Sequence, residues 1–222
     1  MRELTLRLTI GLIGAFALAA LFSVIGLWVM ANESVQRFDL AIIDTVQGWE
    51  TPALTAWMKS FTLLGEAKTM VLVSLIVTPF FYFSLRWRPQ AFLFTFVIAG
   101  TGLINYLLKL LFQRPRPEFY RLVDIGGYSF PSGHTMIAFS FFMILLYIVW
   151  RSIRTQSSKW LLFILALFFV SNIGLSRIYL GVHYPSDVLG GILASACYVL
   201  LSITIYSYFQ RKKKLPFLRD KA

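Results

Sequence analysis

The sequence predicts an all-α integral membrane protein with six transmembrane helices. Of its 222 residues, 58% are hydrophobic and the mean hydropathy is +0.71, which is more apolar surface than a soluble domain of this size can bury. Uncharged apolar tracts recur six times along the chain, and the basic residues between them divide unevenly into two groups. Residues 1–222 are expected to form a single domain, because no Ser-, Gly- or Pro-rich linker divides them.

The six tracts approach the length that a bilayer requires, since a spanning helix needs about 20 apolar residues with a range of roughly 17–25. The predicted spans lie near residues 8–30, 69–85, 89–108, 133–150, 160–176 and 188–210. The first tract follows Arg2 and Arg7 as a signal peptide would, but it is too long for a typical signal-peptide core and no clear cleavage pattern follows it. Pro79 falls inside the second span, where we expect a kink rather than a break.

The distribution of basic residues predicts that both termini are cytoplasmic. With six spans, 13 of the 21 Lys and Arg residues fall on the side of the termini, against two acidic residues. The opposite side carries eight basic and eight acidic residues. Cytoplasmic loops of membrane proteins are enriched in Lys and Arg. The net charge of +11 is therefore attributed to topology and to anionic membrane lipids, with no nucleic acid and no obligate protein partner expected.

The longest connection, residues 31–68, joins the first two predicted spans. It mixes acidic with apolar residues, and residues 51–65 are expected to form a short helix at the outer membrane interface, with Trp49 and Trp57 near the lipid headgroups. Capping of the helical bundle is the simplest role for this segment, and substrate gating is the alternative.

Three polar clusters fall in the connections on the predicted non-cytoplasmic side. Their reactive or charged members are Lys109, Arg114 and Arg116; Ser132, Gly133 and His134; and Arg177, His183 and Asp187. His134 and His183 are the only histidines in the chain. The topology was derived from charge counts alone, yet it places both histidines on the same face of the membrane.

Clustered cations at one membrane surface favour a polyanionic ligand. Arg presents a planar fork that matches phosphate oxygens, and Lys adds a mobile point charge. Ser132 is a good N-cap residue for the span that follows, and Gly133 would let N–H groups of a helix N-terminus approach an oxygen atom. Snorkelling basic side chains and an ordinary helix cap would explain each feature singly. The combination with two histidines favours phosphate chemistry.

His183 and Asp187 are predicted to form a pair at the start of the last span. A carboxylate can accept a hydrogen bond from one imidazole nitrogen, fix the tautomer and leave the other nitrogen free as a nucleophile. From the residues alone His134 could also be the nucleophile, although the nearby carboxylate favours His183. Two histidines and Asp187 could bind zinc in principle, but the surrounding cations favour an anionic substrate, so no metal site is expected.

In order and spacing, these clusters resemble the three-part signature of the type 2 phosphatidic acid phosphatase superfamily. The three parts are Lys109 with Arg116-Pro117, then Pro131-Ser132-Gly133-His134, then Ser176-Arg177 with His183 and Asp187. The six-span layout resembles the integral-membrane branch of that superfamily. Within it, the chain is similar to the bacterial phosphatidylglycerophosphatase B group, which also includes undecaprenyl pyrophosphate phosphatases.

This resemblance implies a phosphatase of membrane lipids in the cell membrane, with its active site on the non-cytoplasmic face. The implied substrates are phosphatidylglycerophosphate and undecaprenyl pyrophosphate, with phosphatidic acid as a further candidate. His183 would form a phosphohistidine, Asp187 would orient it and His134 would protonate the leaving oxygen. The resemblance implies that the phosphoryl oxygens are held by Lys109, Arg116, Ser132, Gly133 and Arg177. No metal or organic cofactor is expected, and Arg114, which matches no position of the signature, is assigned a secondary role.

Three alternatives stay open at this point. A phosphotransferase of the same superfamily would pass the phosphoryl group to an acceptor lipid instead of water. A vanadate-dependent haloperoxidase fits a soluble scaffold better. A non-catalytic transporter or receptor for anionic lipids would bind without turnover, and it leaves the pairing of His183 with Asp187 unexplained.

Overall fold

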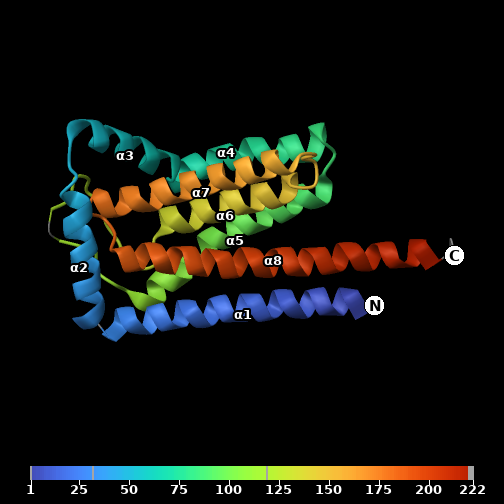
Figure 1. Cartoon of the computed structure of the whole chain (residues 1–222), viewed down its shortest axis with the longest axis horizontal. Coiled ribbons are helices and arrows are strands. Elements are labelled where there is room, and N and C mark those ends of the chain that lie inside the picture. Colours follow the sequence, from blue (N-terminus) through green and yellow to red (C-terminus); the bar gives the residue numbers. More distant parts are fainter. Residues whose placement is uncertain (1, 32, 119, 220–222) are drawn as a thin grey trace.

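The chain folds into a bundle of long helices that run along one common axis, with two shorter helices at one end (Figure 1). The computed structural model describes residues 2–31, 33–118 and 120–219. Every regular element within these ranges is a helix, as expected for an all-α protein. The helices are α1 (Arg2–Ala31), α2 (Glu33–Gln47), α3 (Pro52–Leu64), α4 (Ala67–Pro79), η1 (Phe80–Ser84), α5 (Arg88–Phe112), α6 (Gly133–Val149), α7 (Gln156–Tyr179) and α8 (Pro185–Arg219).

Within the described residues, five helical segments are long and apolar enough to cross a membrane. They are Glu3–Ala31, Ala67–Ser84, Arg88–Phe112, Gln156–Tyr179 and Pro185–Lys212. The sixth predicted span corresponds to α6, an apolar helix of 17 residues. At 1.5 Å per residue it is about 26 Å long, somewhat less than the ~30 Å hydrocarbon core of a typical bilayer. The described ends of α1 and α8 lie at the same end of the bundle (Figure 1).

Two helices continue further than the uncharged tracts that predicted them. We expected Lys109 one residue beyond a span, but α5 continues to Phe112, so Lys109 lies in its last turn. In the same way α7 continues to Tyr179, and Arg177 lies inside its last turn. The two boundaries have different causes. An uncharged tract ends at the first charged residue, whereas a helix ends where the backbone leaves the helical conformation. For α5 this happens at Gln113, whose φ is 45°.

Pro79 marks a change of helix type. The helix α4 ends at Pro79, and the chain continues as the π-helical turn η1 from Phe80 to Ser84. Proline has no N–H to donate and its ring crowds the preceding turn. A wider helical turn beside a proline is one way in which the backbone accommodates both effects, and the helical segment continues to Ser84 without a break, as we expected.

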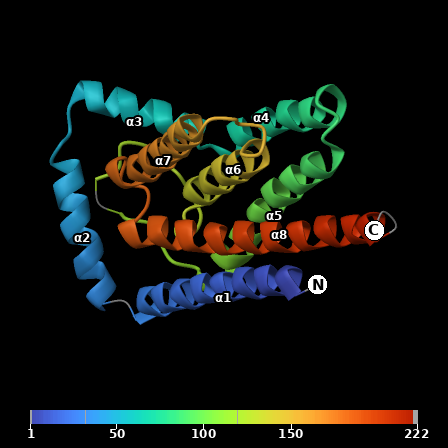
Figure 2. The same ribbon diagram turned by 45° about the vertical axis from the view of Figure 1, so that its right-hand side comes forward.

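The connection between α1 and α4 contains two helices. The short helix expected at residues 51–65 is α3, which begins with Thr51 as N-cap, its side chain accepting from Leu54 N, and with Pro52 in the first turn. A second helix, α2, precedes it and lies across the end of the bundle (Figures 1 and 2). It buries Val35, Asp39 and Ile43 against the bundle. This buried aspartate was not distinguished in the sequence.

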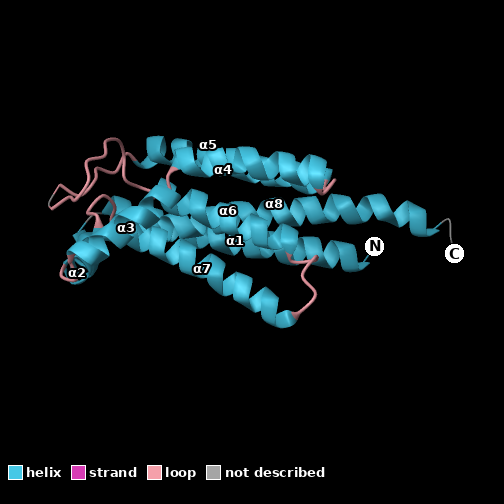
Figure 3. Cartoon of the chain, turned by 90° about the horizontal axis from the view of Figure 1, so that it is seen from above, coloured by secondary structure: helices cyan, strands magenta, loops and turns pink. Residues whose placement is uncertain are grey.

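The end of the bundle beneath α2 is where four helix termini converge. The C-terminal ends of α5 and α7 and the N-terminal ends of α6 and α8 all lie there (Figures 1 and 3). Buried apolar residues along α5, α6 and α7 hold these helices together, among them Phe94, Val97, Ile144 and Ile173. The helix α1 packs along α8 on the outside of this group (Figure 1). The packing thereby brings residues more than 70 positions apart to one site.

Candidate active site

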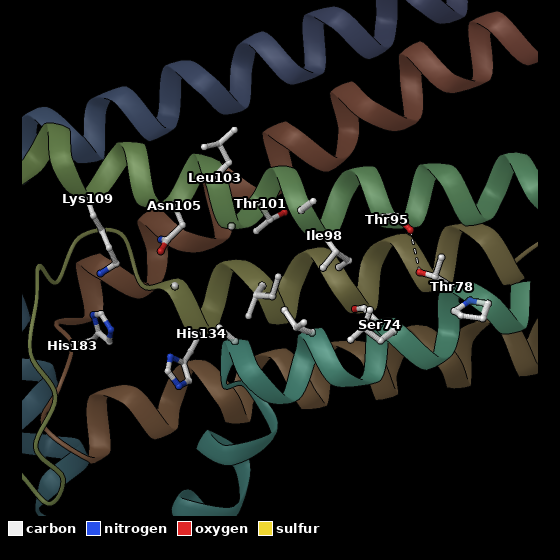
Figure 4. A pocket seen from close by; sticks show the side chains of 18 of the residues that line it. Ser74, Thr78, Thr95, Ile98, Thr101, Leu103, Asn105, Lys109, His134 and His183 are labelled. Atoms are coloured by element: carbon white, nitrogen blue, oxygen red, sulfur yellow. Dashed lines mark hydrogen bonds between the residues drawn. The ribbon is translucent and has the colours of Figure 1, made fainter. Parts of the chain in front are cut away.

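The three sequence clusters meet at this end of the bundle. Lys109 comes from the last turn of α5, His134 from the first turn of α6, and His183 from the loop between α7 and α8. Figure 4 shows these three side chains at the same end of one cavity. The clusters were predicted to face one membrane surface, and in the structure they also line a common space.

His183 and Asp187 form the predicted pair. Nδ1 of His183 lies 3.2 Å from Oδ2 of Asp187, and the same oxygen accepts a 2.9 Å hydrogen bond from the backbone N–H of Tyr184. The two side chains are buried, with 1% and 0% of the residue surface exposed. Their spacing of four positions is bridged by the turn into α8, which begins at Pro185.

The opposite edge of the His183 ring faces Arg116. Nη1 of Arg116 lies 3.0 Å from Nε2 of His183 and 2.8 Å from the carbonyl oxygen of Val182. A guanidinium group only donates hydrogen bonds, so Nε2 must be the accepting nitrogen. The hydrogen of the neutral ring then sits on Nδ1 and is donated to Asp187. This arrangement assigns the tautomer in which Nε2 is unprotonated and its lone pair accepts from Arg116.

The surroundings of His183 also keep it neutral. Burial, followed by the positive charges of Arg116, Arg177 and Lys109, holds the pKa of His183 well below its ordinary value of 6.5. Both effects disfavour a charged imidazole, since burial removes hydration and the cations repel a further positive charge. A neutral ring with Nε2 unprotonated is the form that can attack phosphorus.

His134 lies on the same cavity with an unpaired nitrogen. Its Nε2 atom is buried and has no hydrogen-bond partner in the described part of the chain. Gly65, at the C-terminal end of α3, packs close by: a Cβ atom built there would lie 3.5 Å from Cδ2 of His134. A buried polar atom without a partner, in a residue that lines a cavity, is suited to a ligand that supplies the missing partner.

Arg177 is a buried cation with spare donors. It is 1% exposed, and its Nη1 donates to the hydroxyl of Thr62, whereas Nε and Nη2 have no partner among the described residues. Leaving guanidinium donors both buried and unpaired is costly. An anion beside them would satisfy both nitrogens through the planar fork of the group.

Lys109 and Ser132 make mainly internal contacts in this structure. The Lys109 ammonium group donates to the carbonyl oxygens of Tyr128 and Ser129. The Ser132 hydroxyl caps α6, accepting from Thr135 N at 3.5 Å and from Thr135 Oγ1 at 2.9 Å, while Ser132 N donates to the carbonyl oxygen of Asp187 at 3.0 Å. These contacts tie the Pro131–His134 turn to the start of α8.

Gly133 permits a close approach to α5. A Cβ atom built on Gly133 would lie 2.8 Å from Oδ1 of Asn105, which is too close for unrelaxed packing. Asn105 in turn donates to the carbonyl oxygen of Pro131 at 3.2 Å and thereby holds the turn against α5. Asn105 was not singled out in the sequence, where a lone amide inside an apolar tract carries no distinguishing signal.

The cavity that contains both histidines has a volume of about 720 Å³ and continues between α4 and α5 (Figure 4). Its polar end is lined by Lys109, Arg116, Gly133, His134 and His183. Ser132, Arg177 and Asp187 lie behind this lining and do not themselves border the cavity. Further along it is apolar, and at the far end the hydroxyls of Thr78 and Thr95 lie 3.0 Å apart. Val71, Leu75 and Leu103 border the cavity and are also 49%, 64% and 60% exposed, so it opens on the outer side of the bundle.

Arg114 has a larger part in the site than its secondary assignment suggested. It forms ion pairs of 2.7 Å with Asp187 and with Asp39 of α2. Asp39 was not proposed as a site residue either. The described residues contain no group of three or more His, Cys, Asp or Glu side chains placed to hold a metal ion.

Comparison with known proteins supports the relationship that the motifs indicate. The profile of the PAP2 superfamily matches residues 90–211. Phosphatidylglycerophosphatase B of Bacillus subtilis is 33% identical over 162 residues, which cover 72% of this chain and 79% of that protein. The undecaprenyl-diphosphatase BcrC of Bacillus subtilis is 36% identical over 103 residues, covering 44% of this chain and 48% of that protein.

The fold is also similar to that of a solved structure. A crystal structure of a transmembrane PAP2-type phosphatidylglycerolphosphate phosphatase from Bacillus subtilis superimposes with a TM-score of 0.77 at 30% sequence identity, covering 89% of this chain and 96% of that one. The helical bundle and the polar cavity at its end define a multi-span membrane protein with a site lined by cations and histidines. The chain belongs to the PAP2 superfamily, and the relatives named here are phosphatases of lipid phosphates.

Proposed function

We propose that this protein hydrolyses the phosphate of a membrane lipid through a phosphohistidine on His183. The pairing of His183 with Asp187 carries the proposal, because it leaves Nε2 unprotonated at the polar end of a cavity whose remainder is apolar. The substrates that fit best are phosphatidylglycerophosphate, which yields phosphatidylglycerol, and undecaprenyl pyrophosphate, which yields undecaprenyl phosphate. Both combine a phosphate headgroup with a long apolar tail.

The reaction has two steps, formation and hydrolysis of the phosphohistidine. Nε2 of His183 attacks phosphorus, the bond to the lipid oxygen breaks, and His134 gives that oxygen its proton. His134 then accepts a proton from a water molecule, whose oxygen attacks phosphorus. The bond between phosphorus and Nε2 breaks, which releases inorganic phosphate and restores neutral His183. Asp187 accepts a hydrogen bond from Nδ1–H in both steps and stabilises the positive charge that develops on the His183 ring.

Positive charge at the cavity holds the phosphoryl oxygens. Lys109 and Arg116, which line the cavity, and Arg177, which lies behind the lining, neutralise their charge, and Gly133 leaves room for an oxygen at the N-terminus of α6, where Ser132 is the cap. The unpaired Nε and Nη2 of Arg177 support this assignment, because they are donors without an acceptor. Phosphoryl transfer depends chiefly on positioning and charge stabilisation, which a site of this composition supplies.

The apolar part of the cavity would take the lipid tail. From Lys109 back to Thr95 the wall formed by α5 is about 21 Å long at 1.5 Å per residue, which exceeds half of the ~30 Å hydrocarbon core of a bilayer. A tail can therefore stay within apolar surroundings while its headgroup reaches His183. The opening beside Leu75 and Leu103 lies where membrane lipid would surround the bundle.

The proposal includes a topology with six spans, both termini in the cytoplasm and the site on the non-cytoplasmic face. Cysteine labelling tests it. In a background without Cys197, the only cysteine, Lys59→Cys and Arg154→Cys place thiols at exposed positions. Lys59 belongs to α3 and Arg154 to the loop between α6 and α7, and these two segments lie near opposite ends of the bundle (Figure 1). A membrane-impermeant maleimide should label Lys59→Cys in intact cells and Arg154→Cys only after permeabilisation. The reverse pattern would overturn the proposed orientation.

The activity itself is tested by phosphate release from a panel of purified lipid phosphates and pyrophosphates in detergent. The wild-type protein should release phosphate, with preference for a glycerophosphate or a polyprenyl pyrophosphate. The His183→Ala variant should retain the fold and release none. Equal rates across the panel would contradict the substrate preference, and near wild-type turnover by a folded His183→Ala protein would refute the nucleophile assignment. Release that requires an acceptor lipid would identify a phosphotransferase instead.

A further inference from the structure

We infer that Asp39 and Arg114 are positioning residues that fix Asp187, and through it the His183 ring, from the crossing helix α2. The inference rests on the proposed function, in which His183 is the nucleophile. It extends the site beyond the three sequence clusters to a helix that was expected only to cap the bundle.

Asp39 is a fully buried carboxylate with both oxygens occupied. Its Oδ1 accepts a 2.8 Å hydrogen bond from the backbone N–H of Ser186, and its Oδ2 accepts from the Ser186 hydroxyl at 2.6 Å and from Nη2 of Arg114 at 2.7 Å. Ser186 directly precedes Asp187 in the first turn of α8. Asp39 therefore holds both the backbone next to Asp187 and the cation that contacts Asp187.

Arg114 bridges the two carboxylates. One end of its guanidinium, Nη2, is held by Asp39, and the other, Nη1, donates to Asp187 Oδ1 at 2.7 Å and to the Ser186 hydroxyl at 2.7 Å. The group also lies over the ring of Tyr184, with Cζ 4.0 Å from the ring centroid. These contacts fix the guanidinium plane, so it cannot turn without breaking an ion pair.

This arrangement divides the two oxygens of Asp187 between two tasks. Oδ1 is held by Arg114, which leaves Oδ2 for Nδ1 of His183 and the N–H of Tyr184. A carboxylate anchored at one oxygen cannot rotate, so the other oxygen keeps its direction toward the imidazole. Partners one step removed from a reacting group set tautomer and orientation in this way.

The burial of the group explains why Asp39 is needed. Arg114 has 10% of its side chain exposed, and both carboxylates have 0%. One cation is shared by two buried carboxylates, so each contact matters, because an unpaired buried charge is strongly unfavourable. Asp39→Asn keeps the shape but replaces an accepting oxygen by an NH₂ group, which would face a donor of Arg114 or Ser186. Arg114 would then lose its fixed orientation.

The tautomer of His183 gives a direct measurement. The chain has two histidines, so protein labelled with ¹⁵N-histidine and purified with a histidine-free tag shows two rings by NMR, and His134→Gln identifies the His183 signals. Wild-type His183 should show a protonated Nδ1 and an unprotonated Nε2. In Asp39→Asn, these signals should move toward an average of both tautomers. Arg114→Lys keeps the charge but not the bridging geometry, and should give the same change.

Kinetics provide the second measurement. Asp39→Asn and Arg114→Lys should lower kcat by about 10- to 100-fold, the range typical of lost partners behind a reacting group. KM for the lipid and the inhibition constant of inorganic phosphate should change little, because the phosphate-holding cations are untouched. Asp44→Asn, an exposed aspartate on the same helix, is the matched control and should behave as wild type.

The outcomes separate the two proposals. A wild-type His183 spectrum with unchanged kcat in both variants would overturn the positioning role. Lower thermal stability with an unchanged spectrum and kcat would show a purely structural ion pair and would overturn it too. If wild-type protein released no phosphate from any lipid of the panel, the proposed function would fail, whereas the NMR comparison would still decide whether Asp39 orients His183. Should Asp39→Asn not fold, Arg114→Lys alone carries the test.

Discussion

Nη1 of Arg116 lies 3.0 Å from Nε2 of His183, so the resting site covers the lone pair that the proposed attack requires. Nε of Arg116 donates to the carbonyl oxygens of Gly126 and Gly127, both at 3.1 Å. An incoming phosphate offers a stronger, charged acceptor than the imidazole. Substrate binding would therefore draw the guanidinium from the ring to the phosphoryl group and release the nucleophile.

Arg116→Lys tests this exchange. Lysine keeps the charge but cannot contact the ring and a phosphate oxygen through one planar group. We expect kcat/KM to fall by about 10²- to 10³-fold, as for loss of one oxyanion donor. Arg154→Lys, an exposed arginine in the loop between α6 and α7, should leave kcat/KM unchanged and serves as control. Steady-state phosphate release measures both variants, and an unchanged kcat/KM in Arg116→Lys would contradict the role of the fork.

The low pKa of His183 predicts where activity declines in acid. Burial and the neighbouring cations depress the pKa below 6.5, so the ring stays neutral at pH values at which a free histidine would be protonated. The loss of kcat/KM that is due to protonation of this ring should therefore set in below pH 6.5. A pH profile of kcat/KM with a matching profile of folded protein measures this, and loss of activity with a midpoint above pH 6.5 would count against a neutral, buried nucleophile.

The same shift has a consequence for stability. The pKa of His183 is lower in the folded than in the unfolded chain, so between the two values the unfolded chain binds more protons. The contribution of His183 to the free energy of unfolding is fully present above the pKa of the unfolded chain, near 6.5. It is lost as the pH falls toward the lower pKa of the folded chain. Replacing His183 by Gln should make thermal stability less dependent on pH below 6.5, which melting in detergent at several pH values would measure.

Gly102 offers a way to fill the apolar part of the cavity. It lines the cavity on α5, and a Cβ atom built there meets nothing within 4 Å. Gly102→Leu should therefore fold but raise KM for long-tailed lipid phosphates, while a soluble short-chain phosphate ester should be hydrolysed at the wild-type rate. Ala17→Leu places a leucine side chain on the exposed face of α1 and should change neither rate nor KM. If Gly102→Leu left KM for long-tailed lipid phosphates at the wild-type value, this cavity would be excluded as the tail site.

Gly133→Ala should disturb the turn before α6. The added methyl group would lie 2.8 Å from Oδ1 of Asn105, and overpacking of this kind typically costs about 1–3 kcal/mol. We expect a lower melting temperature and reduced turnover. Combining Gly133→Ala with Asn105→Ala removes the clashing amide, so the double variant should be more stable than the sum of the single effects predicts. Strict additivity in a double-mutant cycle would show that the Asn105 contact is not the cause.

The residues of the candidate site were predictable where their chemistry depends on residue type and spacing. His183 and Asp187 are four positions apart at a helix start, and the turn brings them together whatever the rest of the bundle does. Lys109 and His134 reach one cavity because α5 and α6 follow one another in the chain, so a single loop joins the end of α5 to the start of α6. Residue spacing and the order of the helices were therefore sufficient to predict that the clusters of the signature lie close together.

The contacts of Arg114 could not be predicted in this way. Asp39 is 75 positions from Arg114, and its burial results from α2 lying across the end of the bundle. In the sequence it is one of several acidic residues in residues 31–68, and Asp44, only five positions later, is exposed. Which carboxylate is buried is determined by how α2 packs, and no local pattern carries that information.

The opening between α4 and α5 beside Leu75 and Leu103 has a consequence for how the enzyme meets its substrate. A lipid that enters there arrives by lateral diffusion and never leaves the bilayer. The relevant concentration is then the surface fraction of the lipid rather than its amount per volume. Diluting the substrate with inert lipid or detergent at constant total concentration should therefore slow the reaction, and the dephosphorylated lipid should return to the membrane by the same side opening.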